Sequence, residues 1–184
     1  GIYDEFAHRF ANRVAALEVG PGERAGVAQG PLIDAPALDK VEALLADALG
    51  HGAVALLGGR RHALGGTFFE PTVLTGVTPA MRLSREEIFG PVAALYRFAS
   101  EEEAIALANA TESGLAAYFY TRDIGRGFRV AEALEYGMVG INTGLFSNEV
   151  APFGGIKQSG LGREGSKHGL DEYLEIKSLC FGIG

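Results

Sequence analysis

Short apolar runs of strand length alternate with longer amphipathic segments of helical period along most of this chain. Parallel strands need crossover connections, which are usually helices, and these connections place the helices over the faces of the sheet. The alternation therefore predicts an α/β fold with a mainly parallel sheet and flanking helices, organised as one α/β unit. We expect strands at 53–57, 69–74, 92–98, 115–120, 138–142 and 173–181, and helices at 4–18, 36–49, 100–110, 123–135 and 163–168.

The first two predicted helices each carry an apolar face with a helical spacing. The residues on these faces are Phe6, Phe10, Val14 and Leu17 in the first helix, and Leu38, Val41, Leu45 and Leu49 in the second. The third helix begins with a capping box, in which Ser100 accepts a hydrogen bond from the N3 amide and Glu103 reaches back. The run 53–57 is apolar and bounded by glycines, which is typical of a buried strand.

Composition excludes several classes of protein. The 184 residues can form a domain that buries roughly 70% of its unfolded surface. The net charge of −7 argues against a non-specific nucleic-acid binder, because such binding needs clustered Lys and Arg. No run approaches the length of about 18 apolar residues that a membrane span needs. The chain opens at Gly1 without a Met, a basic n-region or an apolar h-region, so we expect neither a natural start nor a signal peptide there. We also expect the protein to be cytoplasmic.

One glycine motif resembles a nucleotide-binding fingerprint. Residues 160–165 fit the pattern G-x-G-x-x-G, and Ser166-Lys167 follows them. The fingerprint needs a preceding apolar strand and a full helix after it, and a phosphate-binding loop needs Lys before the hydroxyl residue. Neither context is present, so we interpret the segment as a glycine-permitted loop that leads into a short helix.

Metal and nucleophile chemistry has little support among the residues. The histidines show neither i, i+4 pairing nor a partner cysteine, so no metal site is predicted. The single Cys180 lies in a predicted apolar strand without a neighbouring His or Lys, which indicates an inert, buried thiol. Ser147 and Ser159 lack the Gly-x-Ser-x-Gly elbow of serine hydrolases. The four histidines are His8, His51, His62 and His168.

The segment 86–91 leaves two interpretations open. It places Glu86, Glu87 and Phe89 in an irregular stretch before a strand. In one interpretation the segment is a solvated turn whose Phe89 fills the core. In the other, a carboxylate accepts two hydrogen bonds from a diol beside an aromatic face. Spacing alone does not decide between them.

Four segments together resemble motifs of the aldehyde dehydrogenase superfamily, in the family's order and over the whole chain. They are Glu86–Val92, Gly114–Ala117, Gly140–Asn142 and Pro152–Gly160. Within the superfamily, Gly160–Lys167 together with Asp171–Glu175 is similar to the succinate-semialdehyde dehydrogenases.

The resemblance implies a subunit with a dinucleotide-binding domain, a catalytic domain and an oligomerisation sheet. Residues 1–170 correspond to part of the catalytic domain and residues 171–184 to the C-terminal oligomerisation strand, whereas the dinucleotide-binding domain is absent from these residues. The nucleophilic cysteine and the general-base glutamate belong upstream of Gly1, so this chain holds no catalytic residue and is expected to be inactive alone. A homodimer or homotetramer is implied, with residues 174–181 as an intersubunit strand.

The family's reaction begins when a thiolate attacks the aldehyde to give a hemithioacetal. Hydride then passes to NAD or NADP, and an activated water hydrolyses the thioester to the acid. By the motif positions, Glu87 would bind the nicotinamide ribose and Phe89 would pack near the nicotinamide. Phe153 would line the aldehyde tunnel, and Ser147 would hydrogen-bond the distal carboxylate of succinate semialdehyde.

Two other functions stay open. The chain could be a non-catalytic binding or structural domain of the same fold, or part of an aldehyde dehydrogenase with another substrate range. The choice between NAD and NADP is also open, because the residue that meets the 2′ position belongs to the dinucleotide-binding domain.

Overall fold

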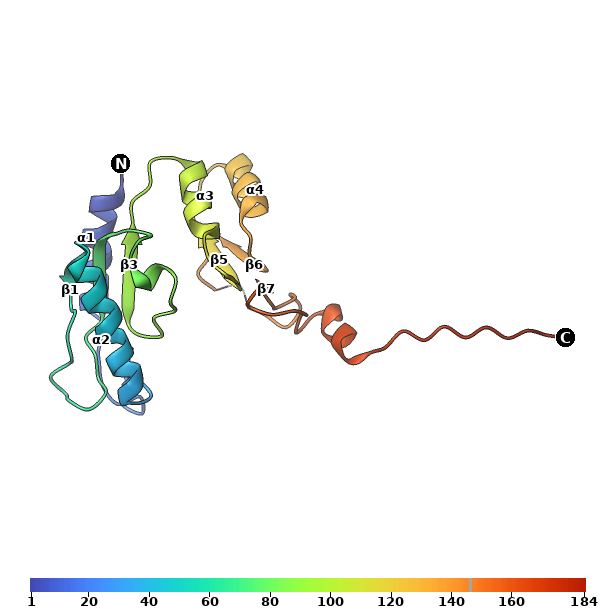
Figure 1. Cartoon of the computed structure of the whole chain (residues 1–184), viewed down its shortest axis with the longest axis horizontal. Helices are drawn as coiled ribbons and strands as arrows, with labels where there is room; N and C mark the ends of the chain where they lie inside the picture. The colour runs from blue at the N-terminus through green and yellow to red at the C-terminus, as the bar shows by residue number, and fades with distance from the viewer. Residues whose placement is uncertain (146) are drawn as a thin grey trace. The chain divides into compact units, whose positions relative to one another are not determined.

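The computed structural model describes residues 1–145 and 147–184, which divide into two compact units, 1–99 and 100–184. Both units combine helices with parallel strand pairs, so the predicted α/β class is confirmed (Figure 1). The prediction of one α/β unit differs from this division. Periodicity shows where elements occur, but it does not show how far one core extends.

Unit 1 contains a three-stranded sheet in the order β1-β2-β3. β2 and β3 are parallel as predicted, whereas β1 pairs with β2 in the antiparallel direction. The connection between β1 and β2 contains no helix, which suits antiparallel neighbours. β1 is an edge strand. Its Val54 is 58% exposed and its other residues are only half-buried, so the prediction of a buried strand there was wrong. The elements are α1 (Tyr3–Ala15), α2 (Ala35–Gly50), β1 (Val54–Leu57), β2 (Thr72–Val77), the 3₁₀ helix η1 (Arg82–Ser84) and β3 (Val92–Tyr96).

Helix α2 supplies one wall of the core of unit 1. Its first turn is capped by Asp34, whose Oδ1 accepts a hydrogen bond from the Ala37 amide at 2.8 Å. Leu44 is buried although the sequence pattern did not include it, and the predicted core residue Leu49 is 42% exposed. The buried face of α2 is therefore rotated slightly about the helix axis relative to the predicted face. Its buried residues are Leu38, Val41, Leu44, Leu45 and Ala48.

Helix α1 packs on the sheet through small residues rather than through its aromatic ones. Ala7 and Ala11 are buried, whereas Phe6 is 49% exposed and stacks on Phe10 with 5.6 Å between ring centroids. Tyr3 ties the helix to both parallel strands, since its hydroxyl donates to the Leu95 carbonyl at 2.9 Å and accepts from the Gly76 amide at 3.2 Å.

Unit 2 contains two short strand pairs. β5 and β6 are parallel and in register from Ala116–Met138 to Phe119–Ile141, and β4 pairs with β7 in the antiparallel direction. The first half of the predicted capping box is confirmed, because Ser100 Oγ accepts from the Glu103 amide at 3.2 Å. The elements are α3 (Glu101–Asn109), β4 (Ser113–Gly114), β5 (Ala116–Phe119), α4 (Ile124–Ala133), β6 (Met138–Ile141), β7 (Ile156–Lys157) and the 3₁₀ helix η2 (Lys167–Tyr173).

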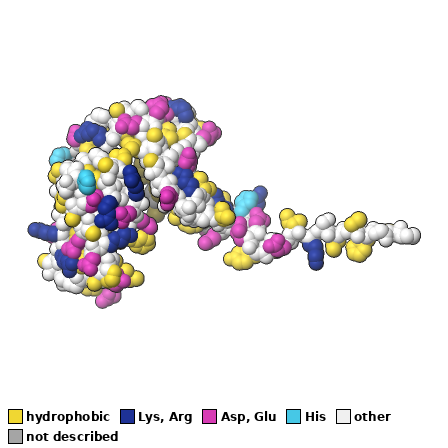
Figure 2. Space-filling model, viewed as in Figure 1, with side chains coloured by type: hydrophobic (Ala, Val, Ile, Leu, Met, Phe, Trp, Pro, Cys, Tyr) yellow, Lys and Arg dark blue, Asp and Glu magenta, His cyan; other side chains and the backbone are white. Residues whose placement is uncertain are grey.

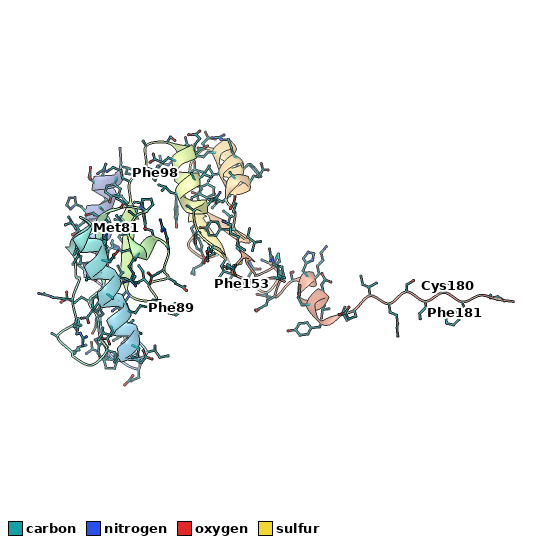
Figure 3. All side chains as sticks on the ribbon, in the orientation of Figure 1. Met81, Phe89, Phe98, Phe153, Cys180 and Phe181 are labelled. Atoms are coloured by element: carbon teal, nitrogen blue, oxygen red, sulfur yellow. The ribbon has the colours of Figure 1, made fainter. Side chains whose placement is uncertain are left out.

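The C-terminal segment departs most from the sequence prediction. The helix expected at 163–168 is replaced by η2, and residues 174–184 form no strand. A strand needs a hydrogen-bonding neighbour, and this segment has none among the described residues. Cys180, predicted to be buried, is exposed for the same reason, as is Phe181 at 84% (Figure 3). Apolar side chains protrude along this extended segment (Figure 2). No helix within residues 1–145 and 147–184 is long and apolar enough to cross a membrane.

Candidate functional site

The irregular segment after η1 places neighbouring side chains in different environments. Ile88 is half-buried and packs against the core of unit 1. Glu87 and Phe89, on either side of it, are both exposed. The anchoring of Ile88 thus turns the two predicted cofactor-binding side chains outward together.

Glu86 forms an ion pair with Arg82 within the fold. Arg82 donates from Nε to Glu86 Oε1 at 2.7 Å and from Nη2 to Oε2 at 2.9 Å, a bidentate geometry. These hydrogen bonds, with the nearby charges of Arg82 and Lys40, hold the pKa of the Glu86 carboxyl below its usual value. The Arg82 amide also donates to Asp47 Oδ2 at 2.9 Å, which ties this pair to α2.

Glu87 differs from its neighbour because its carboxylate has no hydrogen bond or ion pair within the described part of the chain. Phe89 is 76% exposed and adopts a φ of +51°, which is uncommon for a residue with a side chain (Figure 3). The interpretation of Phe89 as a core-filling side chain is therefore wrong, since Ile88 occupies that place. Directly after it, Gly90 lies against α2, where an added Cβ would be 2.4 Å from Val41 Cγ2. Only glycine allows the chain to pass there.

Phe153 lies in unit 2 on the wall of an open cavity of about 570 Å³. Its backbone forms a bridge with Glu164, with N–H···O distances of 2.9 and 2.7 Å. The loop around it packs closely on the start of β6, because a Cβ at Gly137 would be 2.1 Å from the Gly154 carbonyl oxygen. This close approach accounts for the glycine at 137, which lies beyond the end of α4 at Ala133.

Ser147 is exposed on the connection that follows β6. It is not among the residues that line the cavity beside Phe153. Phe146, which precedes Ser147 in the sequence, lies outside the described residues. Beyond it, Asn148 Oδ1 accepts from the amides of Val150 and Ala151 at 3.1 and 3.0 Å, which makes a fixed turn.

The four predicted site residues thus fall into two pairs. Glu87 and Phe89 are near neighbours in unit 1, and Ser147 and Phe153 belong to one connection of unit 2. An unpaired carboxylate beside an exposed aromatic face can accept hydrogen bonds from a diol and pack on a flat ring. Within the described residues, no three His, Cys, Asp or Glu side chains gather as a metal site requires.

The glycine motif adopts the loop conformation that the sequence predicted. Gly160, Gly162 and Gly165 have positive φ values of 103°, 84° and 64°, and the segment leads into η2. Arg163 lies between them and donates from Nη1 to the carbonyls of Gly155 and Gly162 at 2.8 and 2.7 Å. Sequence reasoning missed this support of the Phe153 loop, since nothing in the local pattern marks a contact to backbone carbonyls. It also missed the Arg82–Glu86 pair, although the i, i+4 spacing was a usable signal.

Comparison with known proteins identifies the family. Residues 1–179 match the aldehyde dehydrogenase family, and the chain belongs to it. The chain is 61% identical over 182 residues to the 3-sulfolactaldehyde dehydrogenase of Pseudomonas putida, covering 99% of the chain and 37% of that protein. It is 58% identical over 183 residues to the NADP⁺ succinate-semialdehyde dehydrogenase of Escherichia coli, covering 100% of the chain and 38% of that protein.

A solved structure shows the same fold. The crystal structure of succinate-semialdehyde dehydrogenase from Burkholderia pseudomallei matches with a TM-score of 0.95 and 64% identity, covering 99% of this chain and 38% of that one. The chain therefore spans just over a third of the length of these relatives.

Proposed function

We propose that this chain is the C-terminal part of an NAD(P)-dependent aldehyde dehydrogenase that oxidises a semialdehyde to the acid through a cysteine-bound thiohemiacetal. The observation that carries the proposal is the family match across residues 1–179. The nucleophilic cysteine and the general base would be supplied by the preceding part of the enzyme.

The segment at 86–90 fits a nicotinamide nucleotide. Glu87 has no partner within the described residues, so both carboxylate oxygens can accept hydrogen bonds from the two hydroxyls of the nicotinamide ribose. Phe89 offers an exposed ring beside it. When bound, the nucleotide supplies a hydride acceptor, and these two residues position it rather than take part in bond making.

The substrate class follows from the relatives' names and from Ser147. The substrates named for the two curated relatives reported above each combine an aldehyde with a distal anion, a carboxylate or a sulfonate. In our proposal Ser147 donates a hydrogen bond to that anion and Phe153 lines the path of the aldehyde. Succinate semialdehyde is the substrate that we propose.

Steady-state assays of the full-length enzyme with NAD⁺ and with NADP⁺ test this proposal. We expect kcat/KM for succinate semialdehyde to exceed that for butanal by at least about tenfold, because butanal leaves the anion-binding groups unpaired. Equal values would refute the substrate class and favour an enzyme with another range. Reduction of neither nucleotide by any aldehyde would favour the non-catalytic alternative.

We further propose that residues 174–181 pair between subunits of a homodimer or homotetramer. Leu174, Ile176, Leu179 and Phe181 are 67% to 101% exposed, which is unusual for a run of large apolar residues. Deleting residues 174–184 from the full-length enzyme is expected to reduce its mass in light scattering to that of a smaller assembly. An unchanged mass would contradict this role.

The cytoplasmic location of the protein stays a prediction.

A further inference from the structure

Asn142 ends one of the sequence motifs but has no role in the function proposed above. It follows the last residue of β6 and has a φ of +57°. Its backbone amide donates to the Phe119 carbonyl at 2.9 Å, which continues the β5–β6 ladder by one rung.

The side chain of Asn142 then extends the same ladder. Thr121 donates from its backbone amide to Asn142 Oδ1 at 2.8 Å, and Asn142 Nδ2 donates to the Thr121 carbonyl at 2.8 Å. Both backbone groups of Thr121 are thus satisfied by one amide side chain, which acts in place of a neighbouring strand. This arrangement, called the Asn142 clamp below, joins the carboxyl ends of β5 and β6.

The clamp lies where two connections begin, the one from β5 to α4 and the one that carries Ser147. The carboxyl ends of parallel strands form the edge at which α/β proteins bind ligands. After β5 the chain leads into α4 (Figure 1). Thr121 lies in this connection, and Asp123 caps α4 by accepting from the Arg126 amide at 3.0 Å. After β6 the connection starts at Asn142 and carries Ser147.

The far end of the Ser147 connection is also fixed. The Asn148 turn is followed by a hydrogen bond from the Ser166 amide to the Glu149 carbonyl at 2.9 Å. Between Asn142 and that turn, the described contacts include the local one between Thr143 Oγ1 and the Leu145 backbone. Among the described contacts, the Asn142 clamp and the backbone hydrogen bond from Asn142 to Phe119 tie the near end of the connection to β5.

We propose that Asn142 is a positioning residue that holds the Ser147 connection in place for the distal anion of the substrate. The inference rests on the proposed function of Ser147. Asn142 itself does not touch the aldehyde carbon, so its loss should affect recognition of the anion more than hydride transfer.

Asn109 provides a matched control in the same unit. Its Nδ2 donates to the Ala133 carbonyl at 2.8 Å, and its Oδ1 accepts from the Glu135 amide at 2.9 Å. This is the same kind of two-way contact, but it joins the end of α3 to the end of α4. Its removal should affect stability without affecting the Ser147 connection.

The test compares Asn142→Gly and Asn109→Ala in the full-length enzyme. Glycine tolerates the positive φ, so Asn142→Gly removes the clamp without adding backbone strain. We expect KM for succinate semialdehyde to rise about tenfold while KM for butanal and kcat change little, since two hydrogen bonds of ordinary net strength are lost. Asn109→Ala should leave the ratio of the two KM values as in the parent enzyme.

Hydrogen exchange gives a second readout that does not need substrate. The Thr121 amide should exchange faster in Asn142→Gly and unchanged in Asn109→Ala. If Asn142→Gly does not fold, Asn142→Asp takes its place, because an aspartate side chain cannot donate to the Thr121 carbonyl. Asn109→Asp is then the charge-matched control. Equal KM changes for both substrates, or no change, would overturn the inference. A parent enzyme that oxidises no semialdehyde would instead remove the proposed function, and the inference with it.

Discussion

Replacing Glu87 by glutamine in the full-length enzyme is expected to lower kcat/KM for the nicotinamide nucleotide by about 10- to 100-fold. The reason is that a misplaced reacting group lowers the rate of the chemical step. A charged acceptor makes stronger hydrogen bonds to hydroxyls than a neutral amide does. The nicotinamide would then populate more orientations, and fewer of them would allow hydride transfer. The side chain is exposed and has no partner among the described residues, so the fold should not be affected.

Glu86→Gln is the matched control for this prediction. It makes the same chemical change one residue away, on a carboxylate that binds Arg82. We expect near-parental kinetics, since exposed ion pairs contribute little to stability.

Deuteration of the aldehyde carbon separates the two variants further. If hydride transfer is slowed in Glu87→Gln, the primary isotope effect on kcat should increase there and stay at the parental value in Glu86→Gln. Parental kinetics in Glu87→Gln, or equal losses in both variants, would show that Glu87 does not hold the ribose.

The distinction between Glu86 and Glu87 shows what the sequence could supply at the site. Composition and spacing left the segment undecided between a solvated turn and a cofactor-binding carboxylate, and only the family resemblance selected Glu87. The structure supports the choice of Glu87 on physical grounds. The Glu86 carboxylate is paired with Arg82, whereas Ile88 packs on the core and leaves Glu87 facing outward. The roles of all four residues, Glu87, Phe89, Ser147 and Phe153, stay predictions, and each depended on the family resemblance.

The parts of the fold predicted well are those that local physics determines. Helix α2 begins after Asp34 and α3 after Ser100, since side-chain caps act within one turn. Features that depend on distant residues were missed. The pairing of β4 with β7 joins Gly114 to Ile156, and the Asn142 clamp depends on where β5 ends. The C-terminal strand is a further case, because the partner it needs is not among the described residues.

Leu44→Ala is expected to lower the free energy of unfolding by about 2–5 kcal/mol, the usual range when a fully buried leucine is truncated and a cavity remains. Leu44 is 1% exposed in the core between α2 and the sheet of unit 1. Urea denaturation with an unchanged m-value would measure the loss directly.

Leu49→Ala, on the same helix, distinguishes the buried face of α2 in this structure from the buried face that periodicity predicts. Leu49 fits the sequence pattern for the core but is 42% exposed, whereas Leu44 is outside that pattern and buried. Because alanine has the highest helix propensity and little apolar area is lost, we expect Leu49→Ala to change stability by less than about 1 kcal/mol. A larger loss for Leu49→Ala than for Leu44→Ala would mean that α2 is rotated toward the predicted face. The core packing against β2 would then have to be different from the one described.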